Sequence, residues 1–160
     1  MHSNLSHETS TRVTSKAASI AKLQECLRIE LSAVETYELA LQSVTHVGLH
    51  HTLQEMLSSH ARRTEHLHDK IWRFGGDPPT SSGVWGAFAK VVQAGADLLG
   101  DRTAIAALEE GEDRGLALYK GDLGDCDRRT RKIIHTELLP EQQRTHGLCR
   151  LLKSYVNAPD

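Results

Sequence analysis

The stretch "RIELSAVETYELAL", Arg28–Leu41, places an acidic side chain inside an otherwise apolar helical stripe. Glu30 and Tyr37 are seven residues apart, so on an α-helix they share one face, about two turns from each other. The stretch "EGEDRGLALYKGDL" repeats this arrangement with Glu112 and Tyr119, 82 residues further along the chain. A buried, ionised carboxylate without a partner is strongly destabilising. The repetition therefore predicts a polar site inside a helical core.

Apolar steps of three and four residues continue along most of the chain and are typical of amphipathic helices. They predict four long helices at residues 18–45, 48–74, 101–122 and 127–156. The sequence shows no sustained alternation with period two, which would indicate strands. Each predicted helix carries one polar residue near the middle of its core stripe: Glu30, His60, Glu112 and Glu141.

The links between these helices predict how they are connected. The short, glycine-containing links "HVGLH" and "GDLGDCD" favour two antiparallel hairpins. The longer link after Phe74 opens with "GGDPPTSSG", which ends the helix, and continues into a short helix laid over the bundle. A link of this length can reach the other end of the bundle, so the second and third helices are expected to run parallel. The residues of this short helix expected to turn inward are Trp85, Phe88, Val92 and Leu99. The predicted fold class is all-α: a ferritin-like four-helix bundle with one long crossover between helices 2 and 3 that carries a short extra helix.

The two predicted hairpins also resemble each other in sequence. The pair Arg63-Thr64 recurs as Arg144-Thr145, and His60 corresponds to Glu141, both at an offset of 81 residues. The halves are therefore expected to pack about a pseudo-twofold axis. Pro140 lacks a backbone N–H, and it predicts a kink just before Glu141.

Length and composition restrict the class of protein. The 160 residues predict one domain at residues 18–157 after a disordered polar tail at residues 1–17. The net charge is −2 and no basic helix face stands out, so neither nucleic acid nor a membrane is expected as a partner. Three scattered cysteines without a CxxC motif, and no signal-peptide core, favour reduced thiols and a cytoplasmic location.

Residues 19–155 resemble a bacterial family of ferritin-like bundles labelled as a domain of unknown function, related to bacterioferritin and rubrerythrin. The resemblance rests on "GGDPP", "SSGVWGAF", "LEEGEDRGLALY" and "RTHGLCRLL". In addition, "IELSAVETY" is similar to the first helix of bacterioferritins, where Glu30 falls on an iron-binding glutamate. The resemblance implies the ferritin-like fold, a cytoplasmic setting and a stress-related role, but no established activity.

One hypothesis is a metal centre. Carboxylate and imidazole ligands from four helices suit two iron or manganese ions. Such a centre would act in iron oxidation, in oxygen or peroxide chemistry, or in metal handling. The candidate ligands are Glu30, His60, Glu112 and Glu141, with His146 at the edge of the stripe.

The second hypothesis is a buried Arg–Glu network. Ferritin-like di-iron sites take Glu-x-x-His from helices 2 and 4, whereas this chain has His60-Ala-Arg-Arg63 and Glu141-Gln-Gln-Arg144. Arginine stays protonated and cannot ligate a metal, but it pairs with carboxylates. Arg63 and Arg144 would then replace the metals in a non-catalytic bundle, with Tyr37 and Tyr119 either forming hydrogen bonds to the network or filling the core. We prefer this hypothesis, which predicts a loss of roughly 3 kcal/mol for Arg63→Ala or Arg144→Ala. Homo-oligomers are expected through the region of Trp72 and Trp85.

Overall fold

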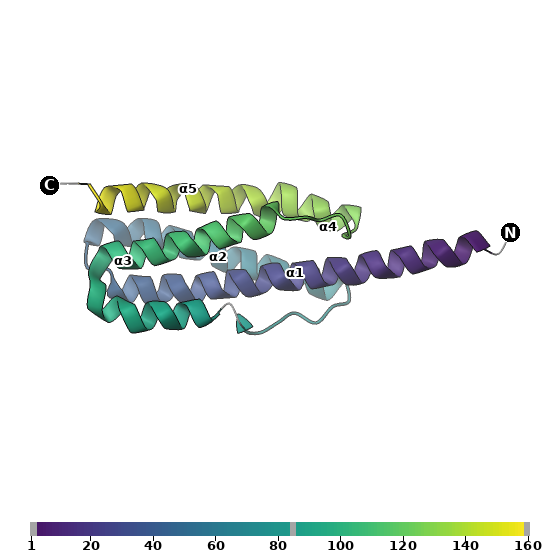
Figure 1. The fold of residues 1–160 in the computed structure, drawn as a ribbon, viewed down its shortest axis with the longest axis horizontal. Helices are drawn as coiled ribbons and strands as arrows, with labels where there is room; N and C mark the ends of the chain where they lie inside the picture. The colour runs from purple at the N-terminus through teal and green to yellow at the C-terminus, as the bar shows by residue number, and fades with distance from the viewer. Residues whose placement is uncertain (1–2, 84–85, 159–160) are drawn as a thin grey trace.

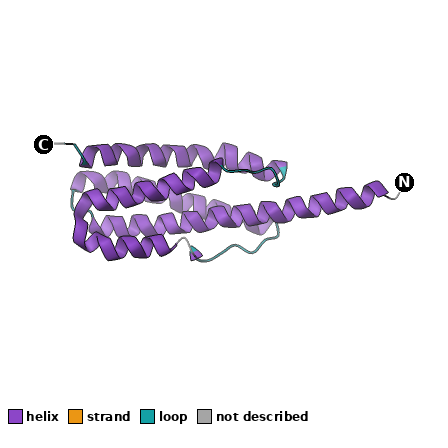
Figure 2. Cartoon of the chain, viewed as in Figure 1, coloured by secondary structure: helices purple, strands orange, loops and turns teal. Residues whose placement is uncertain are grey.

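The computed structural model describes residues 3–83 and 86–158, and the side chains of residues 15–83 and 100–158. Every long element in these ranges is a helix and none is a strand, which confirms the all-α class (Figure 2). The long helices are α1 (Ser3–Ser43), α2 (Val47–Arg73), α3 (Gly86–Lys120) and α5 (Leu139–Val156). A short helix, α4 (Arg128–Ile133), and a π-helical turn, η2 (Ile134–Leu138), precede α5.

The first helix is longer than the sequence pattern indicates. A disordered tail is predicted for residues 1–17, whereas α1 already begins at Ser3. Figure 1 shows these first turns extending beyond the other helices. Residues 3–17 are thus helical in the structure, and the bundle itself is formed by the later part of α1.

The turn between α1 and α2 forms the first antiparallel hairpin, as predicted (Figure 1). The side chain of His46 accepts a hydrogen bond from the backbone N–H of Gly48 at 3.1 Å and so caps α2. The carboxylate of Asp101 accepts hydrogen bonds from the backbone N–H groups of Thr45 and His46 at 2.8 and 3.0 Å. These bonds connect the hairpin turn to α3.

The crossover begins where glycine ends α2. Gly75 has φ 80°, a left-handed conformation that favours glycine, and the N–H of Gly76 donates to the carbonyl of Ile71 at 2.9 Å. The chain then runs back along the bundle, so that α2 and the later part of α3 point the same way (Figure 1). Gly100, with φ 71° and ψ −174°, bends α3 between the predicted crossover helix and the main helix.

The inward orientation predicted for Trp85, Phe88, Val92 and Leu99 lies outside the described residues and side chains. Trp72, the other residue of the predicted contact surface, is 69% exposed. No helix in the described part of the chain combines the length and the apolar character that crossing a membrane requires.

The last helical segment is interrupted where Pro140 predicts a kink. Asp127 caps α4 by accepting a hydrogen bond from the N–H of Thr130 at 2.7 Å. In η2 the N–H of Leu139 bonds back to Ile134, five residues earlier, instead of four. A π-helical turn accommodates one extra residue. After η2, each side chain therefore faces the direction that the preceding residue would face in an uninterrupted α-helix.

The bundle core consists of two apolar clusters with a polar layer between them. One cluster contains Leu23, Leu27, Leu67, Ile71, Ile134 and Leu138. The other cluster contains Ala40, Leu53, Met56, Ile105, Leu108 and Cys149. Along each long helix, the residues that separate the two clusters are polar and buried. The fold thus places a hydrogen-bonded layer at mid-bundle, with apolar side chains above and below it.

Candidate functional site

Eight side chains form this polar layer, which we call the central network. None of them is more than 4% exposed. Its members are Glu30 and Tyr37 on α1, His60 and Arg63 on α2, Glu112 and Tyr119 on α3, and Gln142 and Thr145 on α5. In the structure, Glu30, His60 and Glu112 meet in the core, as predicted.

His60 connects the two carboxyl groups. Its Nδ1 lies 2.8 Å from Oε2 of Glu30, and its Nε2 lies 3.0 Å from Oε1 of Glu112. Burial alone lowers the pKa of His60, but the charge of Glu30 and the hydrogen bonds to both glutamates raise it above its ordinary value. An imidazolium ring can donate one hydrogen bond to each carboxylate, so the geometry favours the protonated form.

Arg63 provides the second cation of the network. Its Nε donates to Oε2 of Glu30 at 3.1 Å. Burial raises the pKa of Glu30, but the charges of Arg63 and His60 outweigh burial and hold that pKa below its usual value. Glu30 is therefore a buried carboxylate with cationic partners.

The rest of the Arg63 guanidinium is poorly satisfied. Its Nη2 lies 2.7 Å from Nδ1 of His60, which cannot accept a hydrogen bond while it is protonated. Its Nη1 is buried and has no hydrogen-bond partner among the described residues. Only Nε of this buried cation thus has a clear acceptor.

The two tyrosines exchange hydrogen bonds between the hairpins. Tyr119 on α3 donates to Oε1 of Glu30 at 2.5 Å, and Tyr37 on α1 donates to Oε1 of Glu112 at 2.7 Å. Burial, followed by the nearby carboxylates, raises the pKa of both tyrosines well above the usual value. The hydroxyls therefore remain neutral donors, and their placement follows the predicted pseudo-twofold relation.

α5 contributes two neutral donors. Gln142 Nε2 and Thr145 Oγ1 donate to Oε2 of Glu112 at 2.6 and 2.9 Å. Gly115 on α3 leaves room for this contact, because a Cβ at that position would lie 2.8 Å from Nε2 of Gln142. Gln142 is not among the site residues predicted from the sequence.

The prediction that Glu141 lies on the core stripe is wrong. Its side chain is 44% exposed and accepts hydrogen bonds from Ser59 Oγ at 2.9 Å and Arg144 Nε at 3.2 Å. The extra residue of η2 turns Glu141 away from the centre and turns Gln142 toward it.

Arg144 and His146 also lie outside the central network. The Arg144 side chain is 35% exposed and binds Glu55 through Nη1 at 2.6 Å, so the prediction that it joins the buried network is wrong. His146 Nε2 lies 2.7 Å from Oδ1 of Asp113 rather than near Glu141. The Arg144 side chain lies at the surface, and the His146 side chain, 15% exposed, lies at the edge of the bundle.

A constant repeat offset would have identified Gln142. The offset of 82 residues that relates Glu30 to Glu112 also relates His60 to Gln142 and Arg63 to Thr145. The Arg-Thr pair of the second helix in each hairpin recurs at 81 instead, and that offset aligns His60 with Glu141. After η2, burial follows the offset of 82, because the buried His60 and Arg63 correspond to the buried Gln142 and Thr145.

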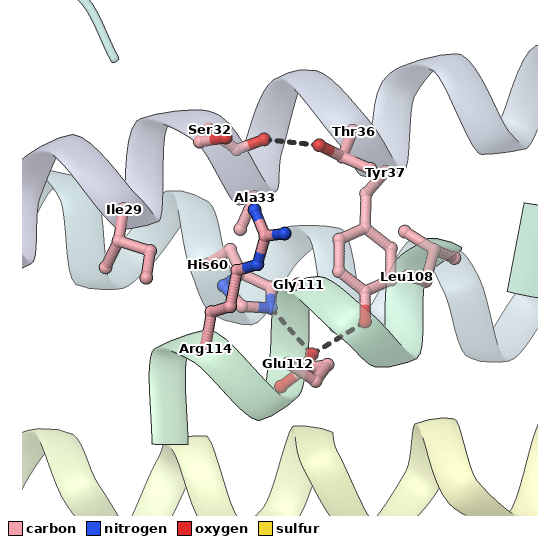
Figure 3. Close-up of a pocket in the computed structure, with 10 residues that line it drawn as sticks. All are labelled: Ile29, Ser32, Ala33, Thr36, Tyr37, His60, Leu108, Gly111, Glu112 and Arg114. Carbon is pink, nitrogen blue, oxygen red and sulfur yellow. Dashed lines mark hydrogen bonds and ion pairs between the residues drawn. The ribbon is translucent and has the colours of Figure 1, made fainter. Parts of the chain in front are cut away.

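A small pocket between α1 and α3 leads to the central network (Figure 3). Its volume of about 30 Å³ is enough for a water-sized molecule. Figure 3 shows the hydroxyl of Tyr37, the carboxyl of Glu112 and the ring of His60 converging at this pocket, with Ser32 and Thr36 on the α1 side. The network is therefore close to solvent in spite of its burial.

The carboxyl oxygens of the network already have protein donors. Glu112 accepts hydrogen bonds from four side chains, and Glu30 accepts them from three. Within residues 15–83 and 100–158, no group of three or more His, Cys, Asp or Glu side chains is placed to hold a metal ion. The donor set as arranged does not fit a metal centre, and metal ligation stays a prediction.

A family model described as "Domain of unknown function (DUF2383)" matches residues 18–123. The matched range contains α2 and the network residues of the first three long helices, but it ends before α4 and α5. No curated protein and no solved structure matches the chain.

Proposed function

We propose that this chain, which belongs to the DUF2383 family, is a non-catalytic, ferritin-like bundle. In it, a buried Glu–His–Arg network takes the place that two metal ions have in bacterioferritin and rubrerythrin. The connectivity supports this proposal, because two antiparallel hairpins are joined by one long crossover (Figure 1). The resemblance to ferritin-like proteins also suggests a stress-related, cytoplasmic role.

One observation carries the proposal: Arg63 and His60 lie where cations would otherwise balance the glutamates. The guanidinium and the imidazolium provide two positive charges beside Glu30 and Glu112, each within 3.1 Å of a carboxyl oxygen. A buried carboxylate needs such compensation, and here the chain supplies it itself. The network then fixes the relative register of the four helices.

Metal analysis tests this proposal. Untagged protein, purified from cells supplied with iron and manganese and then loaded anaerobically with Fe²⁺, is measured by mass spectrometry for bound metal. We expect far less than one ion per chain. One or more ions per chain, lost in both Glu30→Gln and Glu112→Gln, would contradict the proposal.

A matched variant makes the metal analysis sharper. Arg63→His replaces the buried guanidinium by a residue that can ligate metals. If Arg63 replaces a metal, this variant should bind more iron or manganese than the wild type. Arg73→His on the exposed part of the same helix is the control, because Arg73 pairs only with Asp69 among the described residues.

A metal centre is the second candidate, favoured by the meeting of Glu30, His60 and Glu112 from three helices. In this candidate the protein would bind iron or manganese and react with oxygen or peroxide. The guanidinium of Arg63 would first have to leave Glu30. Glu141 and His146 would need to turn inward as well, since both lie toward the surface.

We also propose self-association. Trp72 is 69% exposed on α2, and large exposed aromatic side chains are common at contacts between subunits. Light scattering of the wild type and of Trp72→Glu would reveal a change of mass if this face is a contact. Equal masses for both proteins, at the size of one chain, would rule it out.

A further inference from the structure

The short helix α4 exposes four positive charges at the end of the bundle beyond which the first turns of α1 extend (Figure 1). Its buried residues are Thr130 and Ile133. The other residues of α4 are all basic and exposed, and we call them the basic patch: Arg128, Arg129, Arg131 and Lys132. At 1.5 Å per residue, the six residues of α4 span about 9 Å. The fold thus concentrates these cations on a small part of the surface.

The basic patch has no acidic partner among the residues whose side chains the structure describes. Arg128, Arg131 and Lys132 form no ion pair and no side-chain hydrogen bond with any of those residues. The guanidinium of Arg129 lies over the ring of Phe74, 5.0 Å from its centroid, which leaves its charge without a carboxylate as well. The capacity of these groups to bind an anion is therefore unused.

The acidic residues just before α4 do not compensate the patch. The carboxylate of Asp127 accepts a hydrogen bond from the N–H of Thr130 at 2.7 Å, and that of Asp122 accepts one from the N–H of Gly124 at 2.8 Å. Both carboxylates are thus held at the backbone of their own turns. Asp125 is exposed and forms no ion pair with a described side chain.

The spacing of the patch residues brings like charges together. Arg128 stands three and four residues before Arg131 and Lys132, and residues at these intervals are neighbours on a helix surface. Like charges at this spacing destabilise a helix. An anionic partner would relieve this repulsion.

The charge of the remaining chain restricts the class of partner. The protein has 19 Lys and Arg residues and 21 Asp and Glu residues, so without the four patch residues 15 stand against 21, a formal charge of −6. A long polyanion such as duplex DNA, or an anionic membrane, would also meet this negative surface beside the patch. A short acidic segment would contact the patch alone.

We propose that the basic patch is a docking surface for a short acidic segment of a partner protein. Arginine groups of this kind commonly recognise acidic motifs, because guanidinium donors match the two oxygens of a carboxylate. An extended segment rises about 3.3 Å per residue, so about three residues would span the patch. This inference goes beyond the proposed function and does not depend on the central network, to which α4 contributes no residue.

The test is a fluorescence anisotropy titration of a labelled hexaglutamate peptide with the wild-type protein at low ionic strength. We expect saturable binding with a dissociation constant below about 1 mM, which weakens as sodium chloride is added. A single-stranded oligothymidylate of equal charge and vesicles of equal parts phosphatidylserine and phosphatidylcholine should both bind more weakly. Absence of saturable peptide binding, or tighter binding of the oligonucleotide or the vesicles, would overturn the proposal.

The decisive variant combines Arg128→Gln with Arg131→Gln, because both side chains are exposed and their loss should leave the fold intact. We expect it to weaken peptide binding at least about fivefold, as for the loss of two solvent-exposed ion pairs. The matched control combines Arg62→Gln with Arg150→Gln, which removes the same charge from exposed positions of α2 and α5 and should bind like the wild type. Equal affinities of the two double variants would contradict the assignment.

The repulsion within the basic patch has a measurement of its own. At low ionic strength the patch variant should melt at a slightly higher temperature than the control variant, because it removes neighbouring like charges. The difference should shrink as salt is added. Equal melting temperatures at low ionic strength would show that the patch charges do not repel one another, which would contradict the electrostatic reason for a partner.

Discussion

At the scale of single residues, Arg63 and Arg144 differ although the sequence presents them as equivalents. Arg63 is 4% exposed and faces a carboxylate that is 1% exposed. The Arg144 side chain is 35% exposed, and its partners Glu55 and Glu141 are about half exposed. Breaking a buried ion pair strongly destabilises a protein, whereas solvent-exposed pairs contribute little to stability.

Arg63→Ala should therefore lower the free energy of unfolding by about 3 kcal/mol or more, because Glu30 loses a buried cationic partner. Arg144→Ala should cost less than about 1 kcal/mol. Urea unfolding of both variants under the same buffer conditions measures the difference. Equal losses would show that the burial of Arg63 has no energetic consequence.

Gly115 gives a second prediction at this scale. Glycine to alanine within a helix normally stabilises it by roughly 1 kcal/mol. At position 115 the new Cβ would lie 2.8 Å from Gln142 Nε2, and Gln142 would have to give up its bonds to Glu112. Gly115→Ala should therefore stabilise a Gln142→Ala background more than the wild type, by about 1 kcal/mol.

A double-mutant cycle of these two changes, followed by urea unfolding, measures this coupling. If Gly115→Ala has the same effect in both backgrounds, Gln142 does not depend on the space beside Gly115. The cycle also tests the role of Gln142 in the central network.

At the scale of elements, the π-turn η2 separates what the sequence could predict from what it could not. The apolar period predicted the long helices, and the glycine and proline positions predicted the hairpin turns and the crossover. Glu30, His60 and Glu112 could be placed because they lie on uninterrupted helices. Gln142 could not be placed, because the apolar period assumes the same number of residues per turn along the whole helix. Pro140 indicated where that period is disturbed, but not that the disturbance adds one residue.

Deletions test whether the extra residue of η2 determines which residues of α5 face the core. Removing Thr136, together with Pro140→Ala so that no proline remains in the new α-helix, should convert η2 to α-helix and keep Gln142 on the core side. Removing Gln143 instead, with the same Pro140→Ala change, should rotate the rest of α5 by about 100°.

We expect the Thr136 deletion to retain a cooperative thermal transition close to that of Pro140→Ala alone. The Gln143 deletion should be far less stable, because Thr145 and the apolar residues after it leave the core. Similar melting temperatures for the two deletions would mean that η2 does not set the register of α5.

At the scale of the whole molecule, the two hairpins are similar in backbone and unequal in charge. The first hairpin contributes both cations, His60 and Arg63, while the equivalent positions Gln142 and Thr145 of the second are neutral. Both glutamates therefore depend on protonated groups of one hairpin. The stability of the bundle should consequently depend on pH.

The sign of the pH dependence of stability follows from the direction of each pKa shift. The pKa of His60 is raised from 6.5, so its stabilisation is complete below pH 6.5 and is lost as the pH rises through the higher folded-state value. The pKa of Glu30 is lowered from 4.5, so its stabilisation is present above pH 4.5 and is lost as the pH falls through the lower folded-state value.

Urea unfolding of the wild type and of His60→Gln across this range provides the measurement. The wild type should lose stability above pH 6.5 relative to the variant, and the difference should be constant between pH 4.5 and 6.5. A difference that grows with rising pH would show that His60 is neutral in the folded protein.

The exchanged tyrosine hydrogen bonds have a consequence for how the chain can be divided. Each hairpin carries the tyrosine hydroxyl that donates a hydrogen bond to the glutamate of the other hairpin. A hairpin cut from its partner would therefore contain a glutamate without its tyrosine donor. Peptides produced by a cut in the crossover should be largely unstructured alone and should recover their helices when mixed. The same reciprocity would let two molecules trade halves and form an intertwined pair with every tyrosine–glutamate contact preserved.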